Sequence, residues 1–155
     1  MRKILTVLLL AGIIWPCNNH KSGEHKNFNN PMEVDERLTA TDEKLELNNG
    51  AKWKADSTTN NNVNNLKLIL KKFDKASDKS LSAYKMAQRD LQEGIDKMIA
   101  ECKMEGPNHL ALHKWLEPLM GQVTELKTAG TVPGADKILN AINGQMSLYT
   151  QYFEL

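Results

Sequence analysis

The chain has 155 residues, of which 25% are charged and 41% hydrophobic, and it carries a formal net charge of +1 at pH 7. This length suits one domain. The basic residues form no patch interleaved with aromatic side chains, so a nucleic-acid-binding protein is not expected. The sequence has no Gly-rich phosphate loop and no His-Glu-x-x-His motif, so it does not predict an enzyme either.

Residues 1–17 predict an export signal. Arg2 and Lys3 precede an apolar run from residue 4 to residue 14, which has the length of a signal-peptide core. The run is shorter than the roughly 20 residues that a membrane span needs. Without Arg2 and Lys3, the chain has 18 basic and 19 acidic residues and a net charge of −1.

Cys17 directly follows this run and is a candidate site of lipidation. Its position resembles a bacterial lipobox, except that Trp15 and Pro16 replace the small residues usual before the acylated cysteine. The sequence therefore predicts an exported lipoprotein of the periplasm or outer membrane, held to the membrane by its lipid anchor. Ordinary secretion, with Cys17 incidental or removed, is the alternative.

Residues 18–43 are polar, rich in Asn and nearly devoid of large apolar side chains. Such a segment buries too little surface to offset the entropy of ordering it, so it predicts a flexible tether. His20 and His25 lie in this segment and are expected to be exposed and without a role.

The next stretch, LELNNGAKWK, predicts a short hairpin-like segment. Apolar and polar residues alternate on either side of Asn49 and Gly50. Both central positions of a tight hairpin turn require a positive φ, which Asn and Gly adopt readily. Trp53 is expected to anchor this segment on the main body. A lid over a binding site is the alternative role for its indole ring.

Apolar residues recur at helical spacing after residue 57 and predict four helices. The first follows an N-cap at Ser57, Thr58 or Thr59, and the second spans about residues 78–103. The expected core stripes are Val63, Leu66, Leu70 and Phe73 in the first helix, and Leu81, Tyr84, Leu91, Ile95, Met98 and Cys102 in the second.

The third helix is expected from Asn108, a good N-cap, to Lys127, and the fourth over about residues 134–153. Pro118 is expected to kink or restart the third helix. The remaining stripes are Leu112, Leu116, Leu119, Val123 and Leu126, then Ile138, Ile142, Met146, Tyr149 and Phe153. Short connections make neighbours antiparallel, so residues 44–155 predict an all-α, up-down-up-down four-helix bundle.

The junction of the second and third helices gathers side chains that bind soft metal ions. Cys102 ends one helix, and His109 and His113 share a face of the next because they lie four residues apart. A thiolate and two imidazoles suit copper or zinc. A thioether from Met98 or Met104 would favour copper.

For zinc, Glu101, Glu105 or water would supply the fourth ligand. The alternative is structural: exposed histidines and a buried Cys102 that fills space as a small apolar side chain. If Cys17 carries no lipid, a Cys17–Cys102 disulfide is a further alternative.

The stretches LNNGAKWKAD and CKMEGPNHLALHKWLEPLM resemble a group of uncharacterised short exported proteins of Bacteroidetes-type bacteria. The resemblance covers about residues 45–155. It implies one mature domain that starts near Leu45 and supplies no activity and no ligand.

Two functions follow from these observations. One is a metal-binding protein of the cell envelope that buffers or delivers copper or zinc. The other is a structural or interaction module without a metal, which docks onto an envelope protein with Trp53 and Trp115 near the contact surface.

Overall fold

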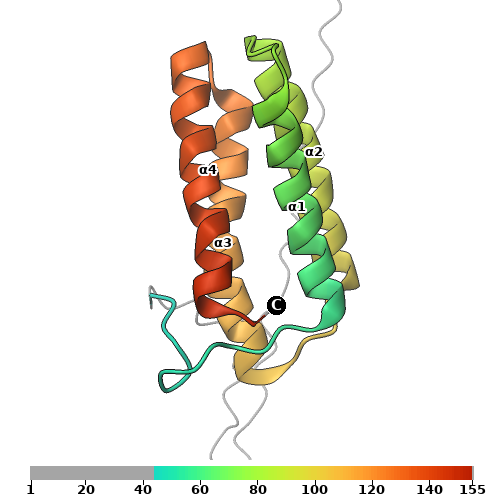
Figure 1. Ribbon diagram of the computed structural model, residues 1–155, viewed down its shortest axis with the longest axis vertical. Helices are drawn as coiled ribbons and strands as arrows, with labels where there is room; N and C mark the ends of the chain where they lie inside the picture. Colours follow the sequence, from blue (N-terminus) through green and yellow to red (C-terminus); the bar gives the residue numbers. More distant parts are fainter. Residues whose placement is uncertain (1–43, 155) are drawn as a thin grey trace, which may run out of the picture. The chain divides into compact units, whose positions relative to one another are not determined.

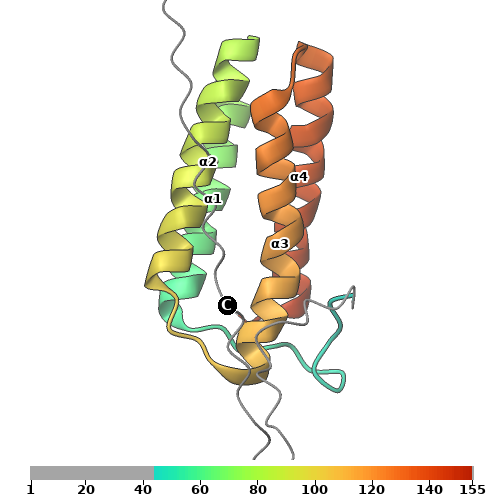
Figure 2. The same ribbon diagram turned by 180° about the vertical axis from the view of Figure 1, so that it is seen from behind.

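The computed structural model describes residues 44–154. The predicted leader, Cys17 and the tether with its two histidines lie outside this part of the chain. The described residues form four helices and no β-strand: α1 (Ser57–Lys75), α2 (Leu81–Glu101), α3 (Gly106–Thr128) and α4 (Val132–Tyr152). Successive helices run antiparallel, with α1 and α2 as one hairpin and α3 and α4 as the other (Figure 1, Figure 2), which confirms the four-helix bundle.

A single apolar core lies between the helices and contains most of the predicted stripe residues. The exceptions are at the edges: Leu81 and Cys102 are half-buried, and so is Ile138 in α4. Leu139 is buried in place of Ile138. It belongs to the regular series of Ala135, Leu139, Ile142, Met146, Tyr149 and Phe153, whose steps of four and three keep it on one helix face.

Helices α1 and α3 begin earlier than the sequence predicts. Asp56, rather than one of the three residues after it, caps α1, and its Oδ1 accepts a hydrogen bond of 2.6 Å from the backbone N–H of Thr59. Helix α3 begins at Gly106, so Asn108 lies inside its first turn and is not the cap. Pro107 suits this turn because an amide there has no partner within the helix.

Helix α2 is shorter than predicted. It follows Ser80, whose hydroxyl accepts from the backbone N–H of Ala83, and it ends at Glu101, so Cys102 lies just outside the helix. Helix α3 does not restart at Pro118, which is exposed within a helix that continues to Thr128.

Residues 44–56, which we term the N-terminal strap, cross the end of the bundle where α2 connects to α3 (Figure 1). Asn48 and Ala51 exchange both backbone hydrogen bonds, at 2.9 and 3.0 Å. Between them Asn49 and Gly50 have φ of 51° and 88°, as a tight hairpin turn requires. The predicted turn is confirmed, although it closes a single bridge and no strands follow.

Trp53 joins the strap to the end of the chain. Its backbone N–H donates to the carbonyl of Tyr152 at 2.8 Å, and its carbonyl accepts from the N–H of Glu154 at 3.0 Å. The side chain of Lys52 donates to the carbonyl of Thr150 at 2.7 Å. These contacts hold the strap against the last turn of α4.

Helices α1 and α2 approach closely at Gly94. A Cβ atom there would lie 2.6 Å from Cδ2 of Leu66, a fully buried side chain with little room to move.

We expect Gly94→Ala to lower the free energy of unfolding by about 1–3 kcal/mol through overpacking. The matched control is Gly144→Ala on α4, where nothing lies within 4 Å of the added atom. It should raise the free energy of unfolding by about 0.5–1 kcal/mol because alanine favours the helix. Denaturant unfolding measures both variants, and equal changes in their free energy of unfolding would contradict the close packing at Gly94.

Tyr84 links α2 to α4, because its hydroxyl donates to Oδ1 of Asp136 at 2.9 Å. Burial, and secondarily this bond and the charge of Asp136, raise the pKa of Tyr84 above its ordinary value of 10.0. The folded protein therefore holds this proton more tightly than the unfolded chain, and the resulting stability is lost as the pH rises above 10. We expect Tyr84→Phe to cost about 1 kcal/mol at pH 7 and less at high pH, measured by urea unfolding across pH.

Candidate functional site

The connection between α2 and α3 brings the predicted thiol and one imidazole into contact. Cys102 follows the last residue of α2, and Gly106, with φ of 64°, turns the chain into α3. His109 lies in the first turn of α3, and its Nδ1 is 3.6 Å from Sγ of Cys102. Both side chains are half-buried. The structure therefore brings these two predicted ligands together.

The distance between these two atoms allows two chemical states. A thiol and an imidazole at this separation form a hydrogen bond when no ion is present. Two ligands of one tetrahedral ion, with bonds of about 2.3 Å to sulfur and about 2.0 Å to nitrogen, lie about 3.5 Å apart. The pair is therefore already spaced as two neighbouring ligands of one ion.

His113 lies one turn after His109 on α3, with the two ring centroids 4.4 Å apart at 58°. The pKa of His109 is lowered from its ordinary value of 6.5, mainly by burial and then by the neighbouring charge of His113, while Glu105 opposes the shift. His109 is therefore mostly neutral at pH 7, the form in which a histidine binds a metal.

The predicted set of three converging ligands is not formed. Within residues 44–154, no three His, Cys, Asp or Glu side chains are grouped so that they could hold a metal ion. His113 is exposed, because helix α3 turns its side chain away from the core. Of the predicted thioethers, Met98 is buried in the core and Met104 is half-buried in the connection.

Two buried polar residues of α1 contact this connection, and the sequence analysis missed both. Thr59 donates from its hydroxyl to Sδ of Met104 at 3.4 Å, and Asn62 donates from its side chain to Glu101 at 2.9 Å. The sequence does indicate that both are buried, because Thr59 and Asn62 fall on the helical stripe that continues through Leu66. Polar residues on a core stripe indicate partners inside the protein.

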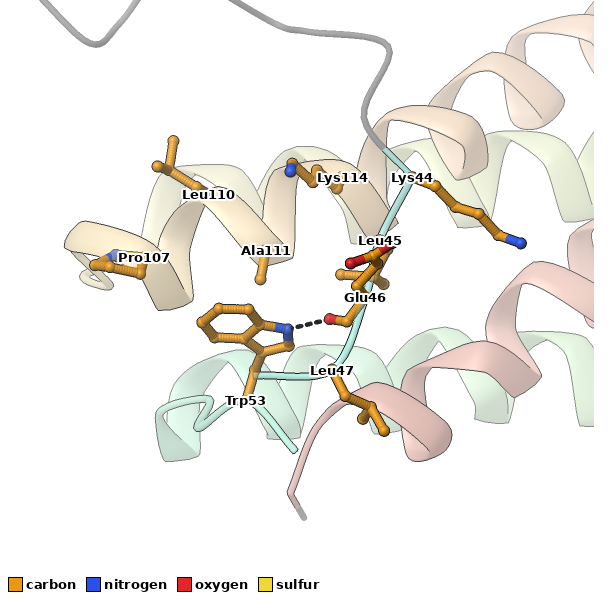
Figure 3. Close-up of a pocket in the computed structure, with 9 residues that line it drawn as sticks. All are labelled: Lys44, Leu45, Glu46, Leu47, Trp53, Pro107, Leu110, Ala111 and Lys114. Carbon is orange, nitrogen blue, oxygen red and sulfur yellow. Dashed lines mark hydrogen bonds between the residues drawn. The ribbon is translucent and has the colours of Figure 1, made fainter. Parts of the chain in front are cut away.

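A shallow pocket of about 510 Å³ lies between the N-terminal strap and the start of α3. Figure 3 shows the Trp53 indole at its centre, facing Ala111, with its N–H donating to the carbonyl of Glu46 at 2.6 Å. Trp53 is half-buried and packs against the core, so it anchors the strap as expected. Apolar side chains of Leu47 and Leu110 at the pocket are 43% and 45% exposed.

Trp115 does not lie on a contact surface. It is 0% exposed, and its indole N–H donates to the carbonyl of Gln145 on α4 at 3.0 Å. The side chain of Gln145 returns a hydrogen bond of 2.7 Å to the carbonyl of Trp115. The predicted partner role of Trp115 is therefore wrong, because the residue belongs to the core between α3 and α4.

None of the helices within residues 44–154 has an apolar stretch long enough to cross a bilayer. Comparisons with protein-family models, with curated proteins and with solved structures find no match for this chain. The residues at the α2–α3 connection and at the strap pocket therefore supply the grounds for a function.

Proposed function

We propose that this chain is an exported binding protein that holds a soft or borderline metal ion, copper or zinc, at the α2–α3 connection. The contact between Sγ of Cys102 and Nδ1 of His109 carries this proposal. Two good ligands for such ions lie at coordination spacing, one just after α2 and one in the first turn of α3, and both are half-buried.

Each residue has a defined part in this proposal. Cys102 would bind as a thiolate and release its proton to solvent, and His109 would bind through Nδ1 as a neutral imidazole. His113, an exposed residue whose ring lies against that of His109, is the second imidazole beside this pair. Zinc would need this further ligand and water, because it prefers four ligands.

Export and lipid anchoring would place this site in the cell envelope, where it would buffer metal ions or deliver them. The grounds are the charged and apolar leader and the cysteine that follows it. Both lie outside the described residues, so they remain predictions from sequence.

A second candidate function is an interaction module of the envelope with no metal. The strap pocket favours it, because Leu47 and Leu110 expose apolar surface beside the half-buried Trp53. Aromatic residues flanked by apolar surface are common anchors of protein interfaces. In this case the Cys102–His109 contact would be only a hydrogen bond between the α2–α3 connection and α3.

The metal proposal predicts that binding depends on Cys102 and His109 together. Full-length protein without an affinity tag should bind one equivalent of copper or zinc, measured by calorimetry and by elemental analysis. Cys102→Ser and His109→Ala should each weaken binding at least about tenfold, since even residues behind the ligands have effects of that size.

The tether variant His20→Ala with His25→Ala is the matched control, and it should bind as the parent protein does. Circular dichroism confirms that each variant remains helical. Equal, near-zero metal in the parent and all variants would exclude this function and leave the interaction module.

The anchoring proposal has a separate test. In cells, the parent protein should fractionate with membranes and show the added mass of acyl chains by intact mass spectrometry, because two or more buried chains give stable anchoring. Cys17→Ser should abolish both. A parent protein of unmodified mass, cleaved near residue 17 and free of membranes, would indicate ordinary secretion.

A further inference from the structure

The connection between α2 and α3 points two sulfur-containing side chains the same way. Residues 102–105 are not helical, and the backbone is extended at Cys102 and Glu105. Side chains two apart in an extended segment lie on the same side. Exposure follows this rule: Cys102 and Met104 are half-buried, whereas Lys103 and Glu105 are exposed. Both sulfur side chains therefore face the bundle.

Each of the two sulfur atoms contacts a side chain of a neighbouring helix. Sγ of Cys102 is 3.6 Å from His109 on α3, and Sδ of Met104 is 3.4 Å from the hydroxyl of Thr59 on α1. Two residues of chain span at most about 7 Å, a gap that a three-bond methionine side chain can close. An ion bound to Cys102 and His109 is thus within reach of the Met104 thioether.

The type of ligand discriminates between copper(I) and zinc. Thiolate and thioether sulfur favour copper(I), whereas zinc prefers four ligands drawn from Cys, His and carboxylates. Residues 44–154 offer no group of three His, Cys, Asp or Glu side chains that could hold a metal ion. The third ligand would then be a thioether, which favours copper(I) over zinc.

Resting on the metal-binding function proposed above, we infer that the bound ion is monovalent copper(I), held by Cys102, His109 and Met104. His113 is not a ligand. Binding would release the thiol proton of Cys102 to solvent and replace the hydrogen bond between Thr59 and Met104 with a metal–thioether bond.

The test compares Met104→Leu with His113→Ala in the full-length protein. Copper(I) is supplied anaerobically in competition with a chromophoric chelator, and zinc is titrated in parallel. We expect the parent protein to prefer copper(I), Met104→Leu to weaken copper(I) binding on the order of tenfold, and His113→Ala to leave it unchanged. Leucine retains the apolar bulk of methionine, and circular dichroism checks that both variants stay folded.

The opposite pattern would overturn this inference. If zinc binds through Cys102 and His109, and its affinity depends on His113 but not on Met104, the metal-binding function stands and the copper(I) assignment fails. If copper(I) binds equally well to the parent and to Met104→Leu, the thioether has no part in the site. If neither ion binds the parent protein, the metal-binding function itself fails.

Discussion

The bundle depends on one apolar core to which all four helices contribute, and this core includes an aromatic column between α3 and α4. Trp115 packs edge-on against Tyr149, with ring centroids 4.9 Å apart, and Tyr149 stacks on Phe153 at 4.7 Å. A buried indole N–H needs a hydrogen-bond partner. The reciprocal pair with Gln145 provides one, so the two helices are joined by polar contacts as well as by apolar burial.

The two ends of the bundle are closed in different ways. Figure 1 shows the end where α1 turns into α2 and α3 into α4. There, lysines donate hydrogen bonds to carbonyls in the last turns of α1 and α3. Lys79 donates to the carbonyls of Phe73 and Asp74, and Lys85 donates to those of Leu126 and Lys127. Cations at these positions also oppose the negative end of the helix dipole. These lysines are therefore engaged in capping.

The opposite end is closed by the N-terminal strap and by polar side chains of α1. Thr59 and Asn62 hold the α2–α3 connection, and Asn60 accepts a hydrogen bond of 2.8 Å from the hydroxyl of Tyr149. The polar residues in the core thus fix a non-helical connection that would otherwise be free to move. The contact of Cys102 with His109 joins this connection to α3, and the strap pocket lies at the same end of the bundle.

The sequence by itself determined the four helices, their order and most of their buried faces, because helical periodicity is a local property of the chain. It also predicted that Cys102 and His109 lie close together, but only the tertiary structure decided how they and their neighbours are oriented. The N-cap of α3 is Glu105, three residues before the predicted cap Asn108, and a capping signal does not set how a helix is rotated against its neighbours. The direction of His113, the burial of Trp115 and the contact of Thr59 with Met104 all depend on how each helix is rotated against the others, which no single helix encodes.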